Sequence, residues 1–170
     1  MPGSTIRVCP GTYAEQVVVC KNNLTIRGSN QDAEREADRN GEGAADKHAG
    51  LTVLRPSALP IDPGSPITGA PRKAILLVDG ATGVSIANLT IDGSAADAGS
   101  AKFANCRLLG FTPGIYYRNS SGTVASTHTT NIRNAARCSA GIFAESGDGG
   151  AANVAVNGNI VDNYGEDGVV

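Results

Sequence analysis

Gly114-Ile115-Tyr116 is the first of three related tripeptides, and Gly141-Ile142-Phe143 and Gly168-Val169-Val170 follow it at intervals of 27 residues. Each joins a glycine to a β-branched residue and a second apolar residue. A pattern that returns at a fixed interval of this length indicates a repeat architecture, because one repeat cannot bury its apolar face without neighbours. The tripeptides therefore predict a solenoid.

A second marker recurs at almost the same interval. Asn131-Ile132-Arg133-Asn134 resembles Ile160-Val161-Asp162-Asn163, with Ile132 and Asn134 each 29 residues before their counterparts. Stacked repeats place equivalent positions above one another, so we expect Ile132 over Val161 and Asn134 over Asn163. Asparagine amides stacked at a turn can hydrogen-bond from one repeat to the next.

The amino-terminal half contains a repeat of its own. Asn23-Leu24-Thr25-Ile26-Arg27-Gly28 returns as Asn88-Leu89-Thr90-Ile91-Asp92-Gly93, with five of six positions identical. Apolar and polar residues alternate in both copies, as in a half-buried strand. Such patterns predict short strands at residues 6–8, 16–19, 24–26, 51–54, 75–78, 84–91, 107–109, 115–117, 124–126, 132, 142–144 and 154–161.

Three such strands fall in each repeat, which favours a parallel coil over an antiparallel sandwich. The sequence therefore predicts an all-β, right-handed parallel β-helix of about four to five coils, one domain over residues 1–170. We expect inward columns of like residues, with Ile115 over Ile142 over Val169. Surface insertions are expected at about 29–50, where 32–38 could form a short helix, and at about 55–73, which contains five prolines.

Composition narrows the classes of partner. Hydrophobic residues make up 41% of the chain but aromatic residues only 4%, so the core must be built from Val, Ile, Leu and Ala. The net charge of −2 and the absence of a basic run argue against nucleic acid. No apolar stretch approaches the roughly 18 residues that a membrane-spanning helix needs.

The four cysteines do not form a metal-binding motif. Cys9, Cys20, Cys106 and Cys138 are widely spaced, without a Cys-x-x-Cys pair. Their even number allows disulfides, and buried free thiols are the alternative.

A family resemblance lies at the amino end, in Thr5-Ile6-Arg7-Val8-Cys9-Pro10-Gly11-Thr12-Tyr13-Ala14-Glu15-Gln16-Val17-Val18-Val19 and in residues 23–28. This stretch resembles the first coil of bacterial right-handed parallel β-helix repeat proteins of the pectin methylesterase and pectate lyase-like superfamily. The resemblance implies an exported protein, extracellular or at the cell surface, that binds or acts on carbohydrate. In relatives a helix precedes this strand and caps the coil.

Here almost nothing precedes Ser4, and the chain stops within a repeat at Val170. We therefore expect uncapped or truncated ends, with homo-oligomers such as a homodimer formed through the open coil ends. The catalytic motifs of the pectin methylesterases, polygalacturonases and pectate lyases have no counterpart here.

Aromatic residues suggest a contact surface for glycans. Tyr116 should stack beneath Phe143 in an exposed apolar strip, on which sugars could place their C–H faces. A partner interface and simple shielding under a loop are the alternatives.

Candidate catalytic residues are Arg118, Glu145, Asp162 and His128. Arg118 and Glu145 follow the aromatic pair on the same strands and should form either a cross-strand ion pair or a catalytic couple. His128 could act as a base together with Tyr116 and Arg118, or could be a polar turn residue.

Candidate metal ligands are Asp162, Glu166 and Asp167, which form an acidic turn around Tyr164. Closely spaced carboxylates could hold Ca²⁺, the one cofactor considered, or divide into a general acid and base; a solvated turn is the alternative.

Two hypotheses result. The first is a non-catalytic β-helix module that contacts glycans or assembles with other chains. The second is a carbohydrate-active enzyme, or a fragment of one: a polysaccharide lyase, epimerase or hydrolase acting on acidic polysaccharide.

Overall fold

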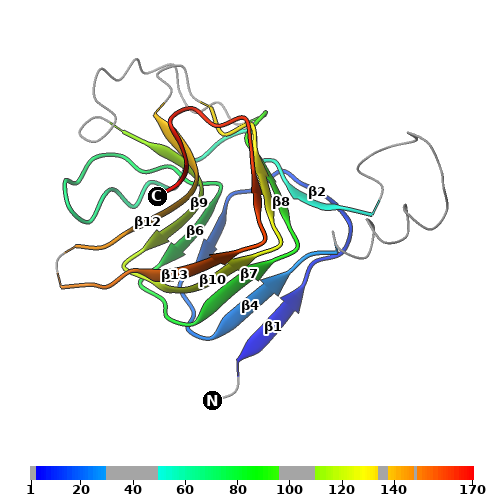
Figure 1. The fold of residues 1–170 in the computed structure, drawn as a ribbon, viewed down its shortest axis with the longest axis horizontal. Coiled ribbons are helices and arrows are strands. Elements are labelled where there is room, and N and C mark those ends of the chain that lie inside the picture. Colours follow the sequence, from blue (N-terminus) through cyan, green and yellow to red (C-terminus); the bar gives the residue numbers. More distant parts are fainter. Residues whose placement is uncertain (1–2, 30–49, 96–109, 134–137, 148) are drawn as a thin grey trace.

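The computed structural model describes residues 3–29, 50–95, 110–133, 138–147 and 149–170, and every regular element in these ranges is a β-strand (Figure 1). The strands form three sheets of five. The first sheet holds β1 (Ser4–Arg7), β4 (Leu24–Arg27), β7 (Val84–Ala87), β10 (Ser121–Ala125) and β13 (Asn153–Asn157). The second holds β2 (Gly11–Tyr13), β5 (Thr52–Leu54), β8 (Thr90–Asp92), β11 (His128–Thr130) and β14 (Ile160–Val161). The third holds β3 (Val17–Val19), β6 (Leu76–Asp79), β9 (Thr112–Arg118), β12 (Ser139–Glu145) and β15 (Asp167–Val169).

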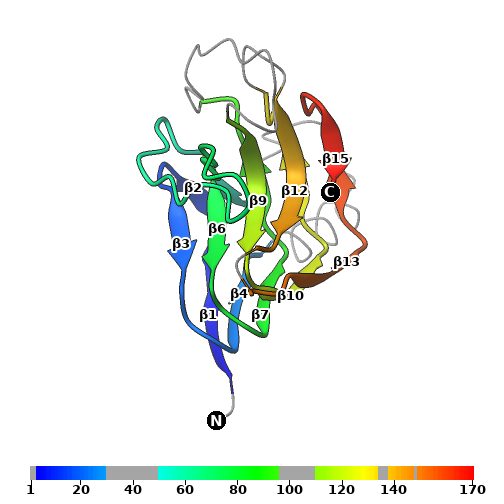
Figure 2. The same cartoon turned by 90° about the vertical axis from the view of Figure 1, so that its left-hand side faces the viewer.

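Each sheet takes every third strand of the chain, and every strand pairing is parallel. Figure 2 shows the third sheet from its outer side, with β3, β6, β9, β12 and β15 side by side. This all-β arrangement is consistent with the predicted parallel β-helix. No helix in the described ranges is long and apolar enough to cross a membrane.

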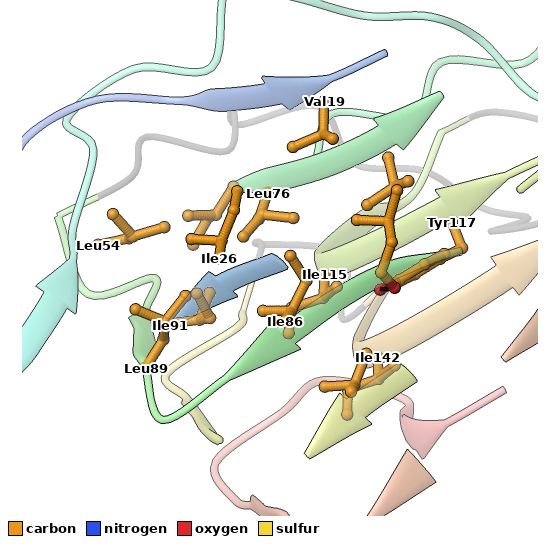
Figure 3. Close-up of a cluster of buried hydrophobic side chains, with 14 of the residues drawn as sticks. Val19, Ile26, Leu54, Leu76, Ile86, Leu89, Ile91, Ile115, Tyr117 and Ile142 are labelled. Carbon is orange, nitrogen blue, oxygen red and sulfur yellow. Dashed lines mark hydrogen bonds between the residues drawn. The ribbon is translucent and has the colours of Figure 1, made fainter. Parts of the chain in front are cut away.

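Apolar side chains fill the space between the three sheets (Figure 3). In the first sheet Ile26, Ile86 and Val124 are register partners and are all buried. In the third sheet Ile142 pairs with both Ile115 and Val169, which confirms the predicted column. Each fully buried aliphatic side chain contributes roughly 2 kcal/mol of hydrophobic stabilisation.

The repeating glycines have a steric cause. A Cβ atom on Gly114 would lie 2.5 Å from Cγ2 of Thr129, and one on Gly141 would lie 2.2 Å from Cγ1 of Val161. Any larger residue would collide with the core of the next sheet. The glycine of the tripeptide marker therefore permits close packing between the second and third sheets.

Several predicted boundaries were wrong because turn residues interrupt the apolar pattern. The expected strand at 84–91 is divided at Asn88, which has a φ of 56°. The expected strand at 154–161 is divided near Gly158, which has a φ of 59°. Residues 107–109 lie outside the described ranges.

The predicted pairing of Ile132 with Val161 was also wrong. Val161 pairs with Thr129 on β11, a strand that the prediction missed because its residues are polar. Ile132 is buried in the core but follows the strand.

An asparagine ladder is present, with a different member from the one predicted. The amide of Asn163 donates to Oδ1 of Asn131, and the amide of Asn131 donates to Oδ1 of Asp92 at 3.0 Å. Both asparagines have positive φ values. The ladder thus joins the carboxyl ends of β8, β11 and β14, three neighbouring strands of the second sheet. Asn134 lies outside the described residues.

Of the two predicted insertions, the structure describes the second one. The first, at about 29–50, and its possible helix at 32–38 lie almost wholly outside the described residues. The second, at about 55–73, runs over the outer side of the third sheet, where Gln16 forms hydrogen bonds in both directions with the backbone of Ile61.

The described cysteines include both free thiols and a disulfide-bonded residue. Cys9 and Cys20 are free and exposed, whereas Cys138 is buried and disulfide-bonded. Cys106 lies outside the described residues.

Candidate functional site

A cavity of about 450 Å³ lies over the outer side of the third sheet, and we call it the outer cleft. Its lining comes from the second insertion, from Phe111 just before β9, from the end of β12, and from residues at both ends of β15. The lining residues are Ile67, Thr68, Arg72, Phe111, Phe143, Ala144, Glu145, Glu166, Asp167 and Val170.

Two phenylalanine rings form the apolar part of the lining. The ring centroids of Phe111 and Phe143 are 4.9 Å apart, and Phe143 remains partly exposed. The guanidinium carbon of Arg72 lies 5.8 Å from the centroid of Phe111 and 6.0 Å from that of Phe143. Arg72 is itself only 3% exposed, so it forms part of the cleft wall.

Tyr116 does stack beside Phe143, with ring centroids 5.5 Å apart and the two residues in register. The expectation that Tyr116 belongs to an exposed strip was wrong, because its exposure is 0%. Its hydroxyl donates to Oε2 of Glu145 at 2.8 Å, beneath the second insertion. The shielding alternative describes Tyr116, and only Phe143 of the pair has surface available to a ligand.

Glu145 holds the second insertion onto the sheet. Its Oε1 accepts a hydrogen bond from the hydroxyl of Ser65 at 2.7 Å, and its Oε2 lies 3.4 Å from Nε of Arg72. Burial raises the pKa of the Tyr116 hydroxyl, and the hydrogen bond to Glu145 and the charge of Glu145 raise that pKa further. Tyr116 therefore stays protonated and keeps donating to Glu145.

The predicted ion pair between Arg118 and Glu145 does not form, although the two residues are register partners. Arg118 instead forms an ion pair with Asp79 on the neighbouring strand β6, with 2.9 Å between Nη1 and Oδ1. The Nε of Arg118 donates to the backbone oxygen of Gly64. The insertion supplies partners to both residues, and the repeat pattern gave no information about those partners.

His128 lies on β11 in the second sheet, in a strand and not in a turn. Its Nε2 is 2.9 Å from Oδ2 of Asp162. It therefore does not join Tyr116 and Arg118, which are on the third sheet.

Asp162 is bound locally to the second sheet. The hydroxyl of Thr130 donates to its Oδ1, and His128 contacts its Oδ2. These contacts, that from Thr130 first, lower the pKa of Asp162.

The three candidate metal ligands do not lie together in one site. Glu166 and Asp167 line the outer cleft, whereas Asp162 is held by His128 and Thr130 on the second sheet. Within the described ranges, no group of three or more His, Cys, Asp or Glu side chains is arranged to hold a metal ion. The predicted acidic calcium site is therefore not assembled by these residues.

Ser65, Arg72 and Phe111 were not predicted from the sequence. All three come from segments that carry no repeat pattern, and two of them lie in the proline-rich insertion. The structure joins Arg72 and Phe111 in an isolated parallel β-bridge, a contact for which the sequence gives no signal.

No protein-family model, curated protein or solved structure matches this chain. The likeness of residues 5–28 to the pectate lyase-like superfamily therefore rests on those residues themselves.

Proposed function

We propose that this chain is a non-catalytic, secreted or cell-surface module that binds a glycan in the outer cleft. We assign it to the right-handed parallel β-helix proteins of the pectate lyase-like superfamily, with about four to five coils. The observation that carries the proposal is a surface cavity of about 450 Å³ in which a partly exposed phenylalanine lies beside several carboxylates.

Such a lining suits a saccharide on two counts. The C–H face of a sugar ring packs on an aromatic ring, here that of Phe143. Carboxylates accept hydrogen bonds from sugar hydroxyls, and Glu166 and Asp167 are exposed to do so. The volume also falls within the range of roughly 300–1,000 Å³ that is usual for small-ligand sites.

The arrangement of the catalytic candidates favours binding over catalysis. Glu145 and Arg118 hold the second insertion in place, and Asp162 and His128 pair with each other on a different sheet. An enzyme acting on acidic polysaccharide would need such groups to converge around one substrate atom.

A glycan-binding screen followed by calorimetry with the variant Phe143→Leu tests the proposal. Leucine keeps apolar volume but lacks a ring face, so we expect at least about a tenfold loss of affinity, or about 1.4 kcal/mol. Tyr164→Leu is the matched control, because Tyr164 is 39% exposed and lies outside the cleft lining. The proposal fails if no glycan binds the wild type, or if Phe143→Leu binds as tightly as Tyr164→Leu.

A second candidate function, assembly through the coil ends, has an observation of its own. Ile6 and Val169 continue columns of buried residues but are 49% and 51% exposed. The outermost strands β1 to β3 and β13 to β15 each have an edge that pairs with no further strand in the part of the chain that the structure describes. We propose that a second copy covers such an end.

Light scattering over a dilution series tests this assembly. A dimer that Ile6→Asp converts to a monomer, while the fold is retained in circular dichroism, is the expected result. A wild-type monomer at every concentration would rule the assembly out.

A further inference from the structure

The outer cleft has more negative than positive charge in its lining. Glu145, Glu166 and Asp167 contribute carboxylates, and Arg72 is the cation among the described lining residues. Arg72 is paired with Glu145 and lies against the phenylalanine rings. The charge left facing the cavity is therefore that of Glu166 and Asp167.

These two carboxylates are available to a ligand. Both residues are exposed, and neither has an ion-pair partner among the residues that the structure describes. The strand register also places Asp167 near the rings of Phe111 and Phe143. Its register partner, Ala140, packs in one apolar cluster with both rings. The cavity thus combines a ring surface and uncompensated negative charge within one binding site.

That combination distinguishes between classes of saccharide. An acidic sugar would bring its carboxylate toward Glu166 and Asp167, and like charges brought together lower affinity. A neutral sugar would use the ring of Phe143 but would leave the charge of the two carboxylates uncompensated. A sugar that bears a protonated amine meets both features, since its ammonium group can form charge-assisted hydrogen bonds with carboxylates.

We infer that the outer cleft selects cationic, amine-bearing oligosaccharides, such as chains of glucosamine units, over neutral and acidic ones. This inference rests on the proposed glycan-binding function and names the ligand class of the same site.

Calorimetry with four oligosaccharides of equal length tests the inference on the full chain. These are a glucosamine oligomer, its fully N-acetylated counterpart, a neutral β-glucan oligomer and an oligogalacturonate. The acetylated oligomer has the same backbone but no charge, so it isolates the amine. We expect the glucosamine oligomer to bind at least about tenfold more tightly than the acetylated one, with an advantage that shrinks as salt is added.

Paired variants locate the effect. Glu166→Gln with Asp167→Asn should abolish the preference for the free amine, so that the free and the acetylated oligomers bind this double variant with equal affinity. Glu15→Gln removes an exposed glutamate beside the opposite edge of the stack and should keep the preference.

The outcomes separate the two proposals. Equal binding of the free and acetylated oligomers, or tightest binding of oligogalacturonate, would overturn the inference and leave glycan binding in place. If none of the four oligosaccharides binds, the inference fails, and the glycan screen decides separately whether the proposed function stands.

Discussion

Thr129 interrupts a column of side chains that is otherwise built from apolar and aromatic residues. Its register partners are Ile91 and Val161, and Leu54 and Tyr13 continue the column. Thr129 is completely buried, and its Oγ1 makes no hydrogen bond to any described residue. Its Cγ2 methyl, by contrast, fills the space that Gly114 leaves open.

Replacing Thr129 with valine should therefore stabilise the fold. Valine keeps the methyl group and removes a buried hydroxyl that lacks a partner, so we expect a gain of about 1 kcal/mol in the free energy of unfolding in urea. Thr127→Val is the control, because the Thr127 hydroxyl donates to Asn159 at 2.7 Å. The interpretation of Thr129 is wrong if both substitutions destabilise the chain equally.

Asp92 is the most highly connected carboxylate of the second sheet. It pairs with Arg55 at 2.7 Å and accepts hydrogen bonds from Asn131 and from the backbone amide of Ser94. Burial alone would raise the pKa of Asp92, but these hydrogen bonds together lower it below its ordinary value of 3.8.

This lowered pKa predicts acid sensitivity. The unfolded chain, with its higher carboxyl pKa, binds the proton first, so the contribution of Asp92 to stability is complete above the ordinary pKa. It is lost as the pH falls through the lower, folded-state value. Thermal unfolding measured between about pH 6 and pH 2 should show a smaller decline for Asp92→Asn than for the wild type. Parallel curves for the two proteins would contradict this role.

At the scale of elements, the second insertion is held by a small number of polar contacts centred on Glu145. Ser65, Arg72 and Tyr116 all reach this carboxylate, which is only 9% exposed. The insertion thereby buries Tyr116 and shapes one wall of the outer cleft.

Glu145→Gln should loosen the insertion, because the buried guanidinium of Arg72 would lose its carboxylate partner. We expect a loss of about 2–3 kcal/mol in the free energy of unfolding and faster proteolysis within residues 56–72. Asp79→Asn breaks the more exposed pair with Arg118 on the same sheet and should cost less than about 1 kcal/mol. An insertion that resists protease equally in both variants would show that Glu145 does not anchor it.

Strands with apolar residues were predicted from the sequence, whereas a polar strand and the contacts of the second insertion were missed. Ile115, Ile142 and Val169 were placed in one column because a parallel stack repeats its inward residues. The β11 strand was missed because His128, Thr129 and Thr130 lack the apolar alternation of a half-buried strand. Phe111 and Arg72 were missed because contacts between an insertion and a sheet depend on a loop path that no periodicity encodes.

Across the whole molecule, three parallel sheets surround one apolar interior. The outer cleft lies on one side of this stack. The sheets place the polar groups in two separate regions. His128 belongs to the second sheet and Asp162 directly follows a strand of that sheet, whereas Phe143, Glu145 and Asp167 belong to the third. Because of this separation, we assign ligand binding to the third sheet alone.

Amide-resolved NMR during titration with the best oligosaccharide from the screen tests that assignment most directly. We expect chemical-shift changes to be concentrated in β12, β15 and residues 65–72, and β1, β4 and β7 on the first sheet to show none. Changes centred on the first sheet, or on His128 and Asp162, would contradict it.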